Sequence, residues 1–382
     1  MTHIALLFTN YGPYHLARLN AMHQLCQDLN WQVTAIELAR AEADYEWRTS
    51  VEHLPYPFIT ITENQQLEAV NPIKLGQSLI KTLERVQPDA IAIMGYFRPS
   101  MLMALMWGAW TGKARILFSA TKEDDAPRRW WQEQVKRTIL KQFQAALVGG
   151  NPQKRYLTKL GMLPEQIVVG YNVVGNDAFH PSKIRSLPPP IARPFFLSIN
   201  RFIPKKNLSN LISAYAAYSQ QAGSQAWDLV LCGDGQLRPQ LEQQIAELGL
   251  SDRIHLPGFL QQDELLPYFA HAGCFVHAST QEQWGLVVNE AMAAGLPVLV
   301  SNRCGCFEDL VIEGINGWGF DPDNIEQMTG LMVKMSSEMV DAEAMGTAAL
   351  SHIQKFSPAH FAQGLSQAVR VALSEAQPNL IV

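Results

Sequence analysis

Cysteine is scarce in this sequence, and its few cysteines do not form a recognisable set. The 382 residues contain five cysteines, an odd number, and no C-x-x-C pair. A disulfide framework or a zinc ribbon is therefore disfavoured, and reduced thiols are the natural interpretation. Cys304 and Cys306 could ligate a metal, but no other cysteine or histidine stands nearby at a spacing typical of metal sites. We expect no bound metal.

A strong net charge and a long apolar run are also missing. The net charge is -5, and only 17% of the residues are charged. These values disfavour a nucleic-acid partner and a disordered chain. The N-terminus has no basic region before its short apolar run, which predicts a first strand rather than a signal peptide. The apolar stretch at 101–110 is too short to cross a bilayer. We expect a cytoplasmic protein that rests at most on the inner face of the cell membrane.

The glycine-rich fingerprint of dinucleotide-binding domains, G-x-G-x-x-G, is absent as well. The first turn, residues 9–13, has a single glycine, Gly12, which is followed by a proline. A nicotinamide or flavin cofactor is therefore poorly supported, and none is expected.

What the sequence does contain is a regular alternation of short apolar runs and helical segments. This alternation predicts an α/β protein with parallel sheets and helices on both faces. The strand candidates are 4–8, 32–37, 90–94, 116–119, 145–148, 167–169, 195–199, 228–232, 254–256, 274–277 and 297–301.

Five prolines between His180 and Pro194 interrupt the alternation. So many prolines exclude a helix or a central strand and predict a linker between domains. The expected organisation is an N-terminal Rossmann-like domain, a linker, a second Rossmann-like domain and a last helix. Their bounds are 1–180, 181–194, 195–355 and 356–382.

The most informative stretch is 278–298, where a buried strand, a loop and a helix are expected in succession. The helix is expected to begin around Gly285, so the free N–H groups there, with those of Leu286 and Val287, would face a diphosphate. Glu290, one to two turns into the helix, could accept hydrogen bonds from the two hydroxyls of a ribose.

Glu282, in the loop before that helix, could reach the hydroxyls of a transferred sugar. Either glutamate alone would be explained as a surface carboxylate that the helix dipole favours. The two together, with the flanking pattern, favour a binding site.

Two cations, Arg201 and Lys206, follow the first strand of the second domain. Ligands bind at the carboxyl ends of strands in open parallel sheets. A guanidinium and an ammonium there could stabilise a departing nucleoside diphosphate without magnesium. The alternative is a solvated basic loop. The turn at 232–235, Cys-Gly-Asp-Gly, is better explained by a structural role.

These motifs resemble the family-4 retaining glycosyltransferases of the GT-B fold, also called glycosyl transferases group 1. The resemblance is strongest from about Phe195 to Asp321. Glu282-x7-Glu290, followed by Ala-Met-Ala-Ala-Gly-Leu-Pro-Val, looks like the family's signature, and Arg201 with Lys206 resembles its phosphate-binding pair. The resemblance implies two Rossmann-like domains facing across a cleft. It also implies a nucleotide-sugar donor, retention of anomeric configuration and no metal.

The sequence departs from the family pattern at two places in this region. Trp284 replaces the usual phenylalanine, and Gly305-Cys306 stands where two glycines are common. These departures leave the identity of the donor open.

The first domain is expected to bind the acceptor. In GT-B enzymes the first loop approaches the reacting centre, which makes Gly12 and His15 candidates, although packing on the sheet is the favoured explanation of His15. The loop at 119–128 stands where many family members carry a histidine, and this chain has none there. Glu123, Asp124 or Asp125 could bind acceptor hydroxyls, or the loop could be merely solvated.

Residues 126–159 carry eight basic residues and a single acidic one. Apolar residues recur within this segment at i, i+4 spacing, which predicts an amphipathic helix; they are Trp131, Val135, Ile139 and Phe143. Such a helix could face the core with a solvated back. It could instead contact an anionic membrane surface that carries a lipid-linked acceptor.

The expected function is transfer of a hexose-type sugar from a UDP- or GDP-linked donor to a glycan or lipid-linked acceptor. This would serve cell-surface polysaccharide or glycolipid synthesis. Two alternatives stay open: a nucleotide-sugar epimerase of the GT-B fold, and a catalytically silent sugar-binding protein. The resemblance also implies that the tail after Phe356 crosses back to the first domain, with a second hinge strand around 356–358.

Overall fold

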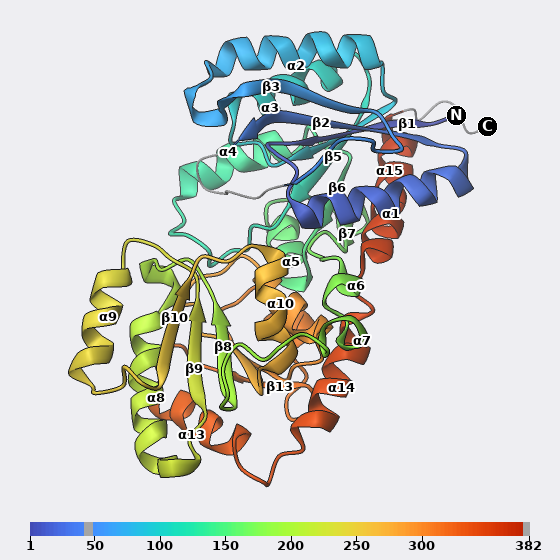
Figure 1. Cartoon of the computed structure of the whole chain (residues 1–382). Helices are drawn as coiled ribbons and strands as arrows, with labels where there is room; N and C mark the ends of the chain where they lie inside the picture. The colour runs from blue at the N-terminus through green and yellow to red at the C-terminus, as the bar shows by residue number, and fades with distance from the viewer. Residues whose placement is uncertain (42–48, 377–382) are drawn as a thin grey trace. The chain divides into compact units, whose positions relative to one another are not determined.

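The computed structural model describes residues 1–41 and 49–376, which form two compact units. Unit 1 comprises Met1–Gly175 and Ser357–Val382, and unit 2 comprises Asn176–Phe356 (Figure 1). Each unit is built on its own parallel sheet.

Unit 1 contains a seven-stranded sheet in the order β3-β2-β1-β4-β5-β6-β7. Every neighbouring pair among these described strands is parallel. The strands are β1 (His3–Phe8), β2 (Gln32–Ala41), β3 (Phe58–Gln66), β4 (Ala90–Met94), β5 (Ala114–Ser119), β6 (Ala145–Val148) and β7 (Ile167–Val169). The central strands are buried almost without a break, as expected when helices cover both faces of a parallel sheet.

Helices lie on both faces of that sheet (Figure 1). They are α1 (Pro13–Leu29), α2 (Pro72–Val86), α3 (Pro99–Trp110), α4 (Trp130–Leu140), α5 (Asn151–Lys159) and α15 (Pro358–Ala376). Several of these helices begin with proline at or near the first helical position. Proline is favourable there because an N–H at that position would have no partner within the helix, so its absence costs nothing. At α2 the Asn71 side chain also accepts hydrogen bonds from the N–H groups of Ile73 and Lys74.

The last helix, α15, returns to the first part of the chain. It packs beside α1 and against β5, β6 and β7. Its inward face is buried through Phe361, Leu365 and Val369. Gly364 permits this approach, because a Cβ there would lie 3.0 Å from the Leu147 side chain and 3.1 Å from the Val169 carbonyl.

Unit 2 contains a six-stranded parallel sheet in the order β10-β9-β8-β11-β12-β13. Its strands are β8 (Phe195–Ile199), β9 (Asp228–Cys232), β10 (Ile254–Gly258), β11 (Cys274–His277), β12 (Val298–Ser301) and β13 (Gly317–Phe320). Strand β8 therefore lies beside β11, although β9 and β10 separate the two in the sequence.

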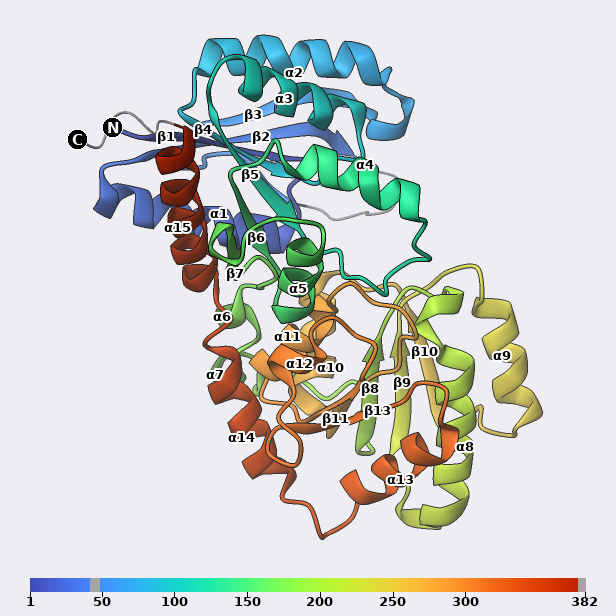
Figure 2. The same ribbon diagram turned by 180° about the vertical axis from the view of Figure 1, so that it is seen from behind.

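The helices of unit 2 also cover its sheet on both faces, as Figure 2 shows from behind. They are α6 (Asn176–Phe179), α7 (Pro181–Ile184), α8 (Leu208–Ala222), α9 (Arg238–Glu247), α10 (Gln262–His271), α11 (Leu286–Ala293), α12 (Phe307–Leu310), α13 (Ile325–Met335) and α14 (Ala342–Ile353). Helices α8 and α13 pack together over the core, which buries aromatic and methionine side chains such as Tyr215, Met328 and Met332.

The structure corrects the predicted linker. Residues 181–194 begin with α7, a short helix that packs on α10 within unit 2, rather than an irregular connection. Pro181 does not prevent this helix, because it stands at the first helical position, where its N–H is not needed. The first unit correspondingly ends at Gly175 rather than at residue 180.

Two strands lie outside the sequence prediction, β3 and β13. Each stands at an edge of its sheet. Their sequences, FITITENQQ and GWGF, are polar or glycine-rich, because an edge strand need not be buried on every side.

Candidate functional site

The carboxyl end of β11 leads into a loop that carries Glu282 and then into α11. The loop beyond β8 carries Lys206. Because β8 and β11 are neighbours in the sheet, their loops meet at the same edge. The Lys206 ammonium donates to Glu282 Oε2 and forms an ion pair with it, although 76 residues separate the two. Both side chains are largely buried.

The Glu282 carboxylate has further partners on its own segment. His277 Nε2 lies 3.4 Å from Glu282 Oε2, and the Ser279 hydroxyl donates to the same oxygen at 3.5 Å. Burial alone would raise the pKa of Glu282. The hydrogen bond from His277 and the charge of Lys206 outweigh that effect and hold the pKa well below its usual range. Glu282 is therefore a carboxylate at any physiological pH.

The loop after β12 holds the Glu282 loop in place through its backbone. The Gly305 N–H donates to the Glu282 carbonyl at 3.1 Å, and the Cys306 N–H donates to the Trp284 carbonyl at 3.2 Å. Cys304 and Cys306 are both buried, and burial raises the pKa of the Cys306 thiol far above its usual value. The backbone of residues 304–306 thus supports the loop that carries Glu282.

Gly285 and Trp284 shape the start of α11. Gly285 has a φ of 105°, a conformation that L side chains rarely adopt, and a Cβ there would lie 3.3 Å from His277 Nε2. Trp284, which replaces the family's usual phenylalanine, is buried, and its indole N–H donates to Asn289 Oδ1 at 2.8 Å. Leu286 and Val287 open the helix, so their N–H groups have no carbonyl partner within it.

Glu290 lies in the second turn of α11 and is half-buried. Within the described part of the chain, its carboxyl group has no hydrogen bond or ion pair. Burial raises the pKa of Glu290 to about 8. Two carboxyl groups on one loop and helix thus differ sharply: Glu282 is ionised and paired, whereas Glu290 is available to a ligand.

Arg201 is exposed on the loop after β8. The turn at 232–235, after the neighbouring strand β9, supports this loop. Phe202, next to Arg201, is fully buried, and its N–H donates to the Asp234 carbonyl at 2.7 Å. Gly233 has a φ of 132°, and a Cβ there would lie 1.8 Å from the Asn200 carbonyl oxygen. The Cys-Gly-Asp-Gly turn therefore has the structural role that the sequence predicted.

Gly12 and His15 lie at the start of α1 in unit 1. Gly12 caps the helix, and its N–H donates to His15 Nδ1 at 3.2 Å. His15 packs against Phe8, with 4.6 Å between the ring centroids. Burial lowers the pKa of His15 well below its usual value, and the charge of Arg18 adds to this. His15 is thus neutral, with its proton on Nε2.

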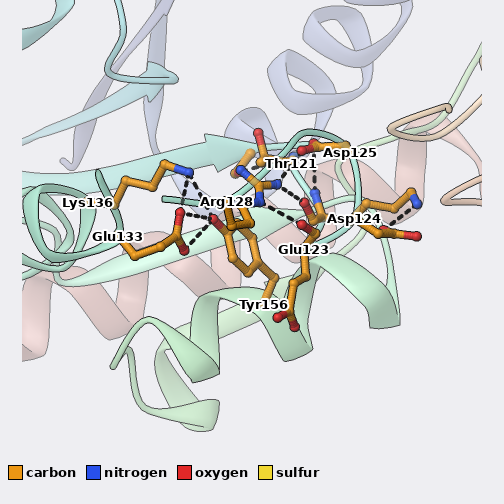
Figure 3. Close-up of polar contacts among 10 residues, drawn as sticks. Thr121, Glu123, Asp124, Asp125, Arg128, Glu133, Lys136 and Tyr156 are labelled. Carbon is orange, nitrogen blue, oxygen red and sulfur yellow. Dashed lines mark hydrogen bonds and ion pairs between the residues drawn. The ribbon is translucent and has the colours of Figure 1, made fainter. Parts of the chain in front are cut away.

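Glu123 and Asp124 lie on the loop after β5 (Figure 3), and both residues are exposed. Glu123 forms an ion pair with Lys159, and Asp124, which is 67% exposed, forms one with Lys122. Asp125 is instead buried and accepts from the backbone N–H of Lys122 at 3.1 Å.

Arg128 fixes the fold of this loop. It forms an ion pair with Asp125, donates to the Glu123 carbonyl at 2.6 Å, and lies over the Tyr156 ring at 4.6 Å from its centroid. Tyr156 in turn hydrogen-bonds Glu133, which also pairs with Lys136 at 2.8 Å (Figure 3). The sequence suggested the acidic residues of the loop but gave no sign of this network, whose members come from three separate segments.

Comparison with known proteins agrees with this architecture. Residues 181–352 match the family described as glycosyl transferases group 1. The chain is 28% identical over 247 residues to the amylovoran biosynthesis glycosyltransferase AmsK of Erwinia amylovora, covering 62% of this chain and 56% of that protein. It is 34% identical over 137 residues to the lipopolysaccharide core biosynthesis glycosyltransferase LpsE of Rhizobium meliloti, covering 36% of this chain and 38% of that one. The matched part thus spans about half, or less, of these relatives' lengths.

Among solved structures, the fold is similar to that of Alr3699/HepE from Anabaena, crystallised with UDP and glucose. The TM-score is 0.75 at 20% sequence identity, over 97% of this chain and all of that one. Two parallel α/β units of this kind define the GT-B fold, which confirms the predicted fold class. The match over residues 181–352 confirms the resemblance to the glycosyl transferases group 1 that was stated from the sequence.

Proposed function

We propose that this protein is a retaining, metal-independent glycosyltransferase. It moves a hexose-type sugar from a UDP- or GDP-linked donor to a glycan or lipid-linked acceptor. The observation that carries the proposal is the meeting of Lys206, Glu282 and the start of α11, with the unpaired Glu290 in the same helix. The names of the relatives, which refer to amylovoran and lipopolysaccharide core biosynthesis, support a role in cell-surface polysaccharide or glycolipid synthesis.

Each group has a distinct task in this proposal. The free N–H groups at the start of α11 and the Lys206 ammonium receive the diphosphate, whose negative charge grows as the bond to the sugar breaks. Glu290 accepts hydrogen bonds from the ribose hydroxyls, and Glu282 accepts them from the sugar. Arg201 adds a second positive charge at the edge of the sheet.

A panel of nucleotide sugars tests the donor. UDP-, GDP-, ADP- and TDP-linked sugars are compared by thermal shift, since a ligand that binds only the folded state raises its stability. A single-turnover reaction with the labelled donor that binds then shows transfer to an added glycan or glycolipid, and NMR of the product shows its anomeric configuration. Formation of an epimer of the donor would instead support a nucleotide-sugar epimerase. Binding of the donor without turnover would support a catalytically silent sugar-binding protein.

Metal independence has its own measurement. Turnover is expected to be unchanged after treatment with EDTA, because Lys206 and the helix start supply the positive potential that magnesium would otherwise provide. Loss of turnover on chelation, restored by magnesium, would contradict this.

Nucleotide affinity is expected to depend on the ionisation of Glu290. Two ribose hydroxyls donate best to a carboxylate, so binding favours the ionised form. Because the pKa of Glu290 is raised to about 8, affinity for the donor should increase by up to about 25-fold between pH 6.5 and pH 8.5. The diphosphate of a nucleotide sugar does not titrate in this range. Calorimetric titration measures the change.

Two variants serve as controls for that measurement. Glu290→Gln should bind with an affinity that does not vary with pH. Glu290→Ala should weaken binding at pH 8.5 by about 1.5–3 kcal/mol, the value of a hydrogen bond to a charged group. A wild-type affinity that is flat across this pH range would refute the role given to Glu290.

We also infer that unit 1 contacts an anionic membrane surface through α4. The apolar residues predicted to line one face of a helix within 126–159 do not all face the core. Phe143 is buried in the core, whereas Trp131 and Val135 are 49% and 53% exposed. Trp130, beside them, is 78% exposed. Exposed basic residues flank these side chains, namely Arg129, Arg137 and Lys141.

Tryptophan with arginine and lysine on one helix suits the boundary between headgroups and acyl chains. None of the helices in the described ranges is long and apolar enough to span a bilayer. Contact through α4 would place the protein at the cytoplasmic face of the membrane, beside a lipid-linked acceptor.

Vesicle sedimentation tests this contact. The protein should bind phosphatidylcholine vesicles only when phosphatidylglycerol is included, and added salt should weaken binding. Replacing Trp130 and Trp131 by serine should lower binding about tenfold or more. Trp110→Ser is the matched control, because Trp110 is 87% exposed but lies on α3. Equal losses in both variants, or binding to neutral vesicles, would rule the contact out.

A further inference from the structure

A fully buried histidine lies against the Glu282 carboxylate. His277 is the last residue of β11, and its side chain is 0% exposed. Its ring is nearly parallel to that of Phe275, with 6.2 Å between the centroids. Nε2 lies 3.4 Å from Glu282 Oε2 and 3.3 Å from the Ser279 hydroxyl. From the sequence alone, this residue has no role beyond ending a strand.

The surroundings of His277 select one tautomer. Its Nδ1 is buried and has no hydrogen-bond partner among the described residues. A proton on Nδ1 would be a buried N–H without an acceptor, which is costly, whereas a lone pair there costs less. The proton therefore sits on Nε2, which donates to Glu282. Burial also lowers the pKa of His277, although the hydrogen bond to Glu282 opposes this. The ring is neutral.

Lys206, the other partner of Glu282, has a competing task. In the proposed reaction its ammonium serves the donor diphosphate, which carries more negative charge than one carboxylate. When the ammonium turns toward the phosphates, Glu282 loses its strongest contact. His277, at 3.4 Å, and Ser279, at 3.5 Å, are the side chains of its own segment that would then still hold it.

On the basis of the proposed function, we propose that His277 is a positioning residue for Glu282. It holds Oε2 through its Nε2–H while Lys206 engages the diphosphate, and it leaves Oε1 to accept a hydrogen bond from the sugar. The ring lies close to the start of α11, because a Cβ at Gly285 would be only 3.3 Å from Nε2. His277 acts through Glu282 and does not itself reach the sugar, because it is fully buried.

Two substitutions separate positioning from packing. His277→Gln keeps a side-chain N–H at about the place of Nε2, whereas His277→Leu has a similar volume and no donor. We expect His277→Leu to lower kcat about 10-fold to 100-fold, as misplacement of a reacting group by about 1 Å does. Its affinity for UDP should stay within about threefold, because Glu290 and α11 are untouched. His277→Gln should recover most of kcat.

A merely structural role predicts the opposite order. A buried glutamine would then destabilise the protein more than leucine, and the melting temperature, UDP affinity and kcat would fall together. That result, or a leucine variant with wild-type kcat, overturns the proposal.

A measurement without turnover tests the contact itself. In protein labelled with [15N]histidine, the signals of His277 are identified by their loss in His277→Leu. These signals should show that Nε2 is protonated and Nδ1 is unprotonated, and Glu282→Gln should shift the Nε2 signal. A proton on Nδ1, or no response to Glu282→Gln, overturns the proposal. A wild-type protein that transfers no sugar from any donor but shows this signal and its response would overturn the proposed function instead, while the His277–Glu282 contact would stand.

Discussion

Replacing Lys206 by alanine should lower turnover of the donor by about 10²–10³-fold, the effect of removing one preorganised group that stabilises developing charge. Two causes act together. The departing diphosphate loses a cation, and Glu282 loses the ion pair that helps to keep its pKa low. Because the charge on the leaving group grows toward the transition state, kcat should fall more than the affinity for the donor.

Steady-state kinetics and UDP titration measure this effect. Arg201→Ala should act in the same direction but less strongly, since Arg201 is exposed to solvent, which screens its charge. Lys183→Ala is the control, because it removes an equal charge from an exposed position on α7 of the same unit. If Lys206→Ala raised KM and left kcat unchanged, Lys206 would contribute ground-state binding only, and leaving-group stabilisation would have to come from elsewhere.

Ending the chain after Phe356 should destabilise unit 1 and abolish transfer, while unit 2 still binds nucleotide. This deletion removes α15, whose Phe361, Leu365 and Val369 are buried against α1 and the sheet of unit 1. Burying one such side chain contributes about 1.5–3 kcal/mol. Their combined loss therefore approaches the whole stability of a typical domain, about 5–15 kcal/mol.

Calorimetry of the shortened chain should show the transition of unit 1 lost or lowered, with nucleotide still stabilising the remaining transition. A point variant tests the same packing with a smaller effect. Leu365→Ala should lower the free energy of unfolding of unit 1 by about 2–5 kcal/mol. Gln367→Ala, on the exposed side of the same helix, should cost almost nothing. Unchanged melting and full activity in the shortened chain would mean that α15 is dispensable.

Much of the fold could be predicted because its signals are local. The alternation of apolar runs and helices marks eleven of the thirteen described strands at nearly their observed positions. The edge strands β3 and β13 were missed, since partly exposed strands lack a continuous apolar run. The linker was wrong at α7 because proline breaks a helix only in its interior, and position within a helix is difficult to judge from the sequence.

The candidate site, like the fold, could be predicted from the sequence only in part. Glu282, Gly285 and Glu290 lie on one loop and one helix, so their spacing alone brings them together. Glu123 and Asp124 were chosen by residue type, and their lysine partners could not be foreseen. One of these, Lys159, stands 36 residues away on α5.

What the sequence by itself determined is therefore the class of fold and the part of the site carried by a single segment, since both depend on neighbours along the chain. Only the tertiary structure decided that Lys206 pairs with Glu282, that the His277 ring lies against the Glu282 carboxylate, and that the loop after β12 hydrogen-bonds the backbone of Glu282. The physical reason is the strand order of unit 2, which sets β8 and β12 on either side of β11. Loops far apart in the sequence meet at the carboxyl edge of those three strands, and their charges and hydrogen bonds combine there into one site.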